Sequence, residues 1–394
     1  MDILTALTTR IPTIMSILTA MITRTNTVTI MTTRMNIPTI PSTPTTMRMI
    51  TATPTTTITP TLTIILTPTP TPTITLTPTI TTIPRAIGHT GTLDPAADGL
   101  LLLCVGPYTK LVPYLVQASK TYRGKIALGL ETTTDDKEGA PTMSGSVEDL
   151  DMARVRSYAS KFIGDIEQMP PRYAAVKVAG KKLYEYAREN LEVEIEPRPV
   201  TVYSFTLGNV EFVDAPAALL ERNPEVESPG KIALVDFEAS VSSGTYVRAL
   251  ARDLGRELGC GGYLASLTRT AVGRFKLDDA VSMDDLTGDP AAAAARMMRG
   301  ASALDVERYP VLTLLKAYEE RLFRGQPLHD KMLVEPADAA NLSGDAIVGL
   351  ASEDGALLAI AQSERFAPED QGNVYGSRYM AHFKMLRVFP NGLR

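Results

Sequence analysis

A strand, a turn and a helix follow one another in KIALVDFEASVSSGTYVRALARDLGRELG (residues 231–259), and this stretch decides the fold class. Apolar and polar residues alternate across 231–241, which predicts a strand with one buried face. After the Ser-Ser-Gly turn at 242–244, apolar residues recur at helical spacing from about Tyr246 to Leu258. Gly259 predicts the end of this helix, because glycine readily takes the left-handed conformation found at helix C-termini. A strand that leads directly into a helix indicates a mixed α and β domain.

The predicted helix carries two different faces. Its apolar stripe consists of Val247, Leu250, Ala251, Leu254 and Leu258. Arg248, Arg252 and Arg256 recur at i, i+4 and i+8 on another face. Two interpretations of this cationic row are open: a solvated charged face, or a row that faces phosphates or carboxylates. Arg248 stands apart because it lies in the first turn, directly after a Gly-Thr-Tyr turn.

Other segments predict further strands and helices around this unit. Residues 122–128 alternate and predict a strand, and the short apolar run GLLLLCVG (99–106) predicts a buried strand between two glycines. A Ser-x-x-Asp pattern that starts at Ser146 predicts the cap of a helix over about 146–164. Three prolines in 208–230 predict a surface excursion there.

The composition divides the chain into three pieces. Residues 1–84 contain 32 threonines and 11 prolines but no glycine, lysine, glutamate or aromatic residue. Residues 85–303 have the composition of a globular domain, which ends in an alanine-rich stretch (290–303) that predicts a helical connector. Short apolar runs separated by glycine and acidic turns predict a small β-rich domain over 306–394.

The threonine and proline tract admits several interpretations. Disorder is the default, because frequent prolines remove hydrogen-bond donors and block helices. A secretory signal fits poorly, since Asp2 stands where basic residues are expected. An organelle transit peptide fits better, because the tract has four arginines and no acid after Asp2. The third interpretation is a translated DNA repeat joined out of frame to a gene whose own beginning is lost.

The totals exclude several classes of site. The chain has 394 residues and a net charge of −5, so any binding of nucleic acid must rest on local basic clusters. Cys104 and Cys260 are too few for a disulfide framework, which favours a reducing cytoplasm. The three histidines, His89, His329 and His382, show no metal-binding spacing. We therefore expect no metal in the chemistry.

The loop GHTGTLDP (88–95) is the first candidate for chemistry. Its glycines permit backbone conformations that other residues avoid, and it precedes the apolar run 99–106. Such a loop could present Asp94 rigidly at the edge of a strand. The alternative is that Asp94 only caps a turn through its own backbone.

The segment PPRYAAVKVAGKKLYEYARE (170–189) is the second candidate. It interleaves cations with aromatic residues: Arg172, Lys177, Lys181, Lys182 and Arg188 with Tyr173, Tyr184 and Tyr186. Cations meet phosphates and tyrosines stack on splayed bases, so the mixture suits single-stranded RNA. A basic helix with tyrosines packed at its base is the alternative.

Four motifs together resemble the TruB family of pseudouridine synthases, which includes dyskerin-like proteins. They are GHTGTLDP, SKTYRG, PPRYAAVKVAGKKLYEYAR and SSGTYVRALARDLGRELGCGGYLASLTRTAVGRF, in the family's order across roughly residues 85–280. The segment from YPVLTL to MLRVFP resembles the family's small PUA-like RNA-binding domain. The resemblance implies an α+β pseudouridine synthase fold, with a mixed, mainly antiparallel central sheet flanked by helices and a small β-rich PUA-like C-terminal domain.

The resemblance also implies a reaction and a set of site residues. Pseudouridine formation breaks the bond from ribose C1′ to uracil N1, turns the base and rejoins it through C5, so no redox change occurs and no cofactor is expected. Asp94 matches the essential aspartate, which either attacks C1′ or takes a proton from the sugar. The remaining matches are Tyr122, which stacks on the base and could transfer a proton, Arg248, which pairs with the aspartate, Leu267 and Tyr246 in the base pocket, and His89, Lys177, Arg172, Tyr173 and Lys181 for RNA contacts.

One departure from the family and three functions remain to be weighed. Members normally begin this domain with a strand and a Lys-Pro-x-Gly loop, and here the tract 1–84 occupies that place. Either the tract is an artefact of a frame shift or start-site error, or the chain is a damaged copy. We expect a monomeric cytoplasmic enzyme that modifies uridine 55 in the T-arm of tRNA. The alternatives are a tRNA chaperone without catalysis and a guide-RNA-dependent subunit like dyskerin.

Overall fold

A computed structural model describes residues 86–94, 96–189, 191–340, 342–366 and 380–394. The interpretations of the tract 1–84 and of the missing first strand therefore lie outside the described residues. The chain forms two compact units. The described residues of the smaller unit are Ala86 and Val281–Met297, and the larger unit comprises Ile87–Ala280 and Met298–Arg394.

The connector predicted over residues 290–303 is helical only at its two ends. In the smaller unit, α7 (Met283–Gly288) is followed by α8 (Pro290–Ala295). Of the predicted connector, α8 is thus the first helical piece, and the second is a 3-10 turn over Gly300–Ala303, which belongs to the larger unit. Ser282 and Asp289 cap α7 and α8, because their side chains accept hydrogen bonds from backbone N–H groups of the first turn.

Seven strands form the central sheet of the larger unit. Their order is β13-β12-β4-β11-β10-β7, with β2 paired to β12. Only the β2–β12 pair is parallel, so the sheet is mixed and mainly antiparallel, as predicted. The strands are β2 (Ala97–Gly99), β4 (Lys120–Leu128), β7 (Gly164–Gln168), β10 (Arg198–Asp214), β11 (Lys231–Val241), β12 (Gly262–Val272) and β13 (Phe275–Lys276).

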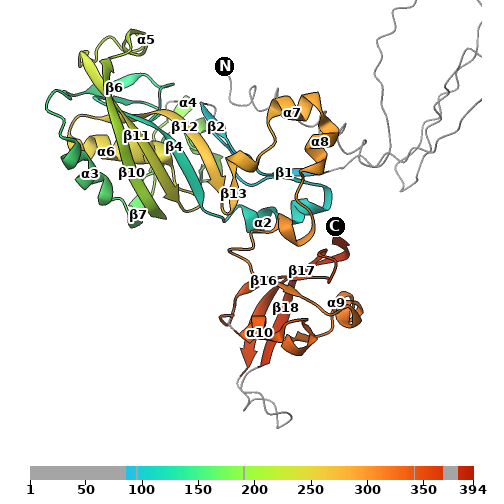
Figure 1. The fold of residues 1–394 in the computed structure, drawn as a ribbon. Coiled ribbons are helices and arrows are strands. Elements are labelled where there is room, and N and C mark those ends of the chain that lie inside the picture. Colours follow the sequence, from blue (N-terminus) through green and yellow to red (C-terminus); the bar gives the residue numbers. More distant parts are fainter. Residues whose placement is uncertain (1–85, 95, 190, 341, 367–379) are drawn as a thin grey trace, which may run out of the picture. The chain divides into compact units, whose positions relative to one another are not determined.

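Helices α3 (Met152–Ser160) and α6 (Val247–Leu258) pack against the central sheet (Figure 1). The predicted helix thus ends where expected, with Gly259 in the left-handed conformation at φ 79°. Leu250 and Leu254 are fully buried in one core with side chains of β4 and β11. Burial of such a leucine stabilises a fold by about 1.5–3 kcal/mol, so the apolar stripe fixes how α6 sits on the sheet.

Short elements surround the central sheet. They are β1 (Ile87–His89), β3 (Leu103–Val105), the 3-10 turn Gly106–Leu111, α2 (Val112–Leu115), β5 (Leu130–Thr132), β6 (Pro141–Ser144), β8 (Lys177–Val178), β9 (Lys181–Lys182), α4 (Leu183–Arg188) and α5 (Ala217–Leu220). β1 pairs with β3, β5 with β6, and β8 with β9, each antiparallel.

The C-terminal part of the larger unit is β-rich. Its five-stranded sheet has the order β14-β16-β17-β18-β15. The elements are β14 (Val311–Thr313), the 3-10 turn Lys316–Tyr318, α9 (Glu319–Phe323), β15 (Leu328–His329), the 3-10 turn Asp330–Met332, α10 (Pro336–Ala340), β16 (Ile347–Ala351), β17 (Leu357–Phe366) and β18 (Met380–Leu393). Leu357 and Phe389 of this part share a buried core with Leu111 and Leu115.

Three predicted elements differ from the structure. Residues 208–214, predicted as a surface excursion, continue strand β10, because their backbone pairs with β11 as far as Asp214 and Lys231. The apolar run 99–106 is not one strand: β2 ends at Gly99 and β3 begins at Leu103. The run is broken because its two ends pair with different strands: β2 pairs with β12, whereas β3 pairs with β1.

The predicted cap of α3 is also wrong. The side chain of Ser146 accepts a hydrogen bond from the N–H of Glu148, which stabilises a local turn. The helix begins later, where the carboxylate of Asp151 accepts a hydrogen bond from the N–H of Ala153 at 2.9 Å. A Ser-x-x-Asp pattern does not distinguish such a turn from a helix cap, because both use the same short polar side chains.

Candidate active site

Asp94 lies in the loop between β1 and β2. Its carbonyl oxygen accepts a hydrogen bond from the N–H of Ala97 at 2.9 Å, so a turn does form at this position. The carboxylate, however, is held by Arg248. Nε of Arg248 lies 2.8 Å from Oδ2 of Asp94, and Nη2 donates to Oδ1 at 3.3 Å. The Asp94 side chain remains 39 % exposed, so one side of this carboxylate is open to a ligand.

Arg248 is buried, and both of its Nη atoms donate hydrogen bonds, whereas Nε lies close to Asp94 without a hydrogen bond. It stands in the first turn of α6, and its side chain is 7 % exposed. Nη1 donates to the carbonyl of Thr134 at 3.0 Å and lies 3.4 Å from Oδ2 of Asp136. Nη2 donates to the carbonyl of Tyr173 at 3.2 Å. A guanidinium with this many acceptors has one orientation available, and it therefore fixes the carboxylate of Asp94 as well.

The cationic row of α6 faces carboxylates. Nη1 of Arg252 lies 2.8 Å from Oδ2 of Asp135, and Nε of Arg256 donates to Oε2 of Glu131 at 2.8 Å. Burial raises the pKa of Asp135 to about 6, although Arg252 opposes this rise. Of the two interpretations left open by the sequence, the row is thus one that binds carboxylates of the chain itself.

Tyr122 and Leu267 come from two neighbouring strands beside this pair. Leu267 on β12 is 8 % exposed, and its register partner on β4 is Gly124, two residues after Tyr122. Burial raises the pKa of the Tyr122 hydroxyl, the charge of Arg269 lowers that pKa, and the charge of Asp94 raises it. Arg269 is the register partner of Tyr122 on β12, so a buried cation lies beside the tyrosine.

Tyr246 is the N-cap residue of α6 and is held through its backbone. Its N–H donates to Oε1 of Gln168 at 2.8 Å, and Nε2 of Gln168 donates to its carbonyl at 3.1 Å. The ring packs against the small core around Val176 and Leu183. Burial raises the pKa of its hydroxyl, while Arg198 and Arg248 lower it.

The predicted RNA-binding residues fall into two groups. His89, Arg172 and Lys177 are exposed, and Tyr173 is half-buried with its carbonyl on Arg248. Lys181 forms an ion pair with Glu189, and its ammonium lies 5.0 Å from the ring centre of Tyr186. The side chains of Lys182 and Arg188 lie outside the part that the structure describes.

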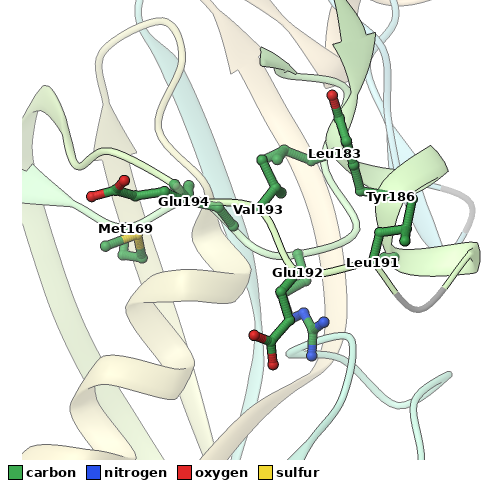
Figure 2. Close-up of a pocket in the computed structure, with 10 residues that line it drawn as sticks. Met169, Leu183, Tyr186, Leu191, Glu192, Val193 and Glu194 are labelled. Carbon is green, nitrogen blue, oxygen red and sulfur yellow. The ribbon is translucent and has the colours of Figure 1, made fainter. Parts of the chain in front are cut away.

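A cavity of about 530 Å³ opens beside the basic segment (Figure 2). Its walls are the side chains of Met169, Arg172, Leu183, Tyr186, Ala187 and residues 191–195. Glu192 and Glu194 belong to this lining, whereas Asp94, Tyr122 and Leu267 do not. The cavity is therefore distinct from the space in front of Asp94.

Sequence reasoning missed Asp136, Gln168 and Arg269. Asp136 lies in the acidic run Thr-Asp-Asp before Gly139, a pattern that indicates a tight turn but no partner. Gln168 is the last residue of β7 and carries no distinctive spacing in the sequence. Arg269 offered the clearest signal, because it is two residues after Leu267 and therefore on the buried face of an alternating strand. A charged residue at such a position requires partners.

Comparison with protein families gives two adjoining matches. The family model described as TruB family pseudouridylate synthase (N terminal domain) matches residues 80–247. The model for the tRNA pseudouridylate synthase B C-terminal domain matches residues 248–305. These ranges contain all ten predicted site residues.

Several curated proteins are similar over most of the chain. The tRNA pseudouridine synthase B of Thermobifida fusca is 37 % identical over 279 residues, which are 71 % of this chain and 85 % of the relative. The tRNA pseudouridine synthase B of Cupriavidus metallidurans is 38 % identical over 283 residues, which are 71 % and 82 %.

A solved structure described as a Cbf5-Nop10-Gar1 complex has a TM-score of 0.50 and 20 % identity. The match covers 77 % of this chain and 76 % of the other. At this identity the likeness bears on the fold alone, and the predicted fold class is confirmed. Within the described part of the chain, no helix combines the length and the apolar character needed to cross a membrane.

Proposed function

Because this chain belongs to the TruB family of pseudouridylate synthases, we propose that Asp94 and Arg248 form its catalytic centre and that its substrate is uridine 55 in the T-loop of tRNA. The chain is a tRNA pseudouridine synthase, an isomerase without net oxidation or reduction. The contact between Asp94 and Arg248 carries the proposal for the site: a half-open carboxylate is held by a buried guanidinium across 154 residues of sequence.

The geometry suits a carboxylate that must stay ionised and stay in place. Arg248 donates a hydrogen bond to Oδ1 of Asp94, and its Nε lies at ion-pair distance from Oδ2, so the guanidinium stabilises the charge of the carboxylate and restrains its position. The Asp94 side chain is still 39 % exposed and therefore accessible. An ionised carboxylate so placed acts at the ribose, by attack on C1′ or by removal of a sugar proton.

The atoms of the reaction balance without a further reactant. The bond between C1′ and N1 breaks, the base turns, and a bond between C1′ and C5 forms. C5 then loses its hydrogen as a proton, and N1 gains a proton. The uridine must leave its stack to reach Asp94, so the rings of Tyr122 and Tyr246 and the apolar side chain of Leu267 provide the pocket.

The proposal extends to the surface that binds RNA. The exposed His89, Arg172 and Lys177, together with Tyr173, lie on segments that border the Asp94 loop or that Arg248 holds. Lys181 supports them from the same basic segment, although its ion pair with Glu189 reduces its free charge. We assign catalysis to residues 85–303 and further tRNA contacts to the β-rich residues 306–394, in a monomeric, cytoplasmic enzyme.

Release of tritium tests the site and the substrate together. A tRNA transcript labelled at C5 of its uridines releases tritium when the C5 hydrogen is lost. The full chain should release label from the wild-type transcript and none from a transcript with cytidine at position 55. Asp94→Asn should abolish release while the dissociation constant for tRNA changes little. Asp98→Asn is the matched control, because Asp98 is an exposed carboxylate four residues away.

Two results would contradict the proposal. Substantial turnover by purified Asp94→Asn would remove Asp94 from the chemistry. Release from the transcript that lacks uridine 55 would show another target. The same assay separates catalysis from a chaperone role, and it requires no guide RNA, so activity of the isolated chain also argues against a guide-dependent subunit.

A further inference from the structure

Arg269 is the most completely buried charged side chain near the site. It is 1 % exposed, and it lies on β12 two residues after Leu267. Nε donates to the carbonyl of Leu100 at 2.7 Å, and Nη2 donates to the carbonyl of Gly91 at 3.2 Å. These acceptors carry partial charge only. Burial of a cation against carbonyls rather than a carboxylate is costly, so an ordinary packing role is better served by an apolar side chain.

The two carbonyls bracket the loop that carries Asp94. Gly91 precedes Asp94 by three residues and Leu100 follows it by six. The backbone of Arg269 holds the same loop, since the N–H of Leu100 donates to its carbonyl at 2.8 Å. Gly99 lies so close to this backbone that an added Cβ would collide with it. One residue thus closes the base of the loop through both its main chain and its side chain.

Tyr122 connects this clamp to the site. It is the register partner of Arg269 across the pair of β12 and β4. Register partners on adjacent antiparallel strands have their side chains on the same face of the sheet, so the side chain of Arg269 lies beside that of Tyr122. The charge of Arg269 lowers the pKa of the Tyr122 hydroxyl and that of Asp94 raises it, which agrees with a phenol near both groups.

We propose that Arg269 is a positioning residue that holds the Asp94 loop in place relative to its strand neighbour Tyr122, so that it sets the rate of isomerisation and not the affinity for tRNA. This inference rests on the proposed role of Asp94. It goes further by giving the strand neighbour of Tyr122 a part in placing the catalytic loop. Lys120, the neighbouring buried cation, points elsewhere: its ammonium donates to the carbonyls of Val116 and Ala118 at 2.6 and 2.8 Å.

The test compares Arg269→Gln and Arg269→Lys with Arg274→Gln in the full chain. Arg274 is the matched control because it also donates to two backbone carbonyls, those of Leu304 and Ser302. We measure single-turnover release of tritium, the dissociation constant for tRNA and the thermal midpoint. Arg269→Gln should slow release at least about tenfold with affinity within about twofold, and Arg269→Lys should recover part of the rate. Arg274→Gln should lower the midpoint but not the rate.

A double-mutant cycle with Tyr122→Phe supplies a readout that a merely structural role would leave unchanged. If Arg269 acts by placing Tyr122 relative to the Asp94 loop, Arg269→Gln should slow the Tyr122→Phe enzyme clearly less than the wild type. Equal slowing in both backgrounds, or a wild-type rate in Arg269→Gln, overturns the inference. Failure of both Arg269 variants to fold also overturns it, because the residue would then serve folding alone. An inactive wild-type chain would instead contradict the proposed function.

Discussion

Replacement of Arg248 should separate what this residue contributes to stability from what it contributes to chemistry. Arg248→Ala removes two contacts to Asp94, one to Asp136 and hydrogen bonds to the carbonyls of Thr134 and Tyr173. Loss of one partner of a buried ion pair typically costs about 3–5 kcal/mol. Because Asp94 is 39 % exposed and water reaches it, we place the loss of unfolding free energy at about 3 kcal/mol, the lower end of this range.

Arg248→Ala should also slow the reaction of the molecules that remain folded. Without Arg248 the carboxylate of Asp94 loses both its neutralising charge and its fixed plane. If the transition state loses about 3 kcal/mol of stabilisation, single-turnover release of tritium slows about 100-fold. Arg248→Lys keeps the charge but not the fork, so it should recover stability better than rate.

Urea denaturation and single-turnover kinetics at one pH provide the two measurements. Arg156→Ala is a suitable control, because Arg156 is an exposed arginine whose side chain donates to the carbonyls of Leu207 and Gly208. It should change neither quantity appreciably. A rate for Arg248→Ala within about threefold of the wild type would refute the reasoning, since the carboxylate would then function without its partner.

Two further predictions concern the scaffold beneath the site. Burial raises the pKa of Asp135 from its ordinary value of 3.8 to about 6, so its contribution to stability is present below the ordinary value and is lost as pH rises through about 6. Relative to Asp135→Asn, the wild type should therefore lose up to about 3 kcal/mol between pH 4 and pH 7 in urea denaturation, and parallel pH curves would contradict this. Gly255→Ala should destabilise the fold by about 2–3 kcal/mol, because its Cβ would collide with the backbone of Gly261 and Gly262. Gly344→Ala, where a Cβ has open space, is the control, and equal thermal midpoints for the two variants would contradict the packing argument.

Local patterns predicted the elements whose determinants are local. The helix over 247–258 was predictable because its apolar spacing and its stop at Gly259 lie within a few residues. Strand β10 was not predictable beyond residue 207, because the prolines of 216–229 suggested a loop, whereas pairing with β11 extends the strand to Asp214. The prediction of the α3 cap was wrong because Ser146 and Asp151 both have short polar side chains of the kind that caps helices, and the local sequence does not distinguish them.

The partners of the site could not be predicted from spacing. The resemblance to a family identified Asp94, Tyr122 and Arg248, but no local pattern relates Arg252 to Asp135 across 117 residues or Arg256 to Glu131 across 125. Gln168 holds the backbone of Tyr246 across 78 residues. Such contacts follow from how β5, β7 and α6 meet in space. The residue type alone does not indicate which of the many acids or amides in the chain will contact a given arginine or backbone group.

The arginine row of α6 shows how an acidic chain can act on RNA. Arg248 and Arg252 are buried, and all three arginines of the row are bound to the chain's own carboxylates or carbonyls. Their charge therefore organises the site and is largely withdrawn from phosphates. It follows that RNA contacts depend on cations of other segments, such as the exposed Arg172 and Lys177. Because Arg248 binds the carbonyl of Tyr173 and Arg252 that of Met169, the same row also holds the base of the segment that carries those cations. Substitutions in α6 should thus alter RNA binding indirectly, through the position of this segment, while the catalytic carboxylate is affected directly.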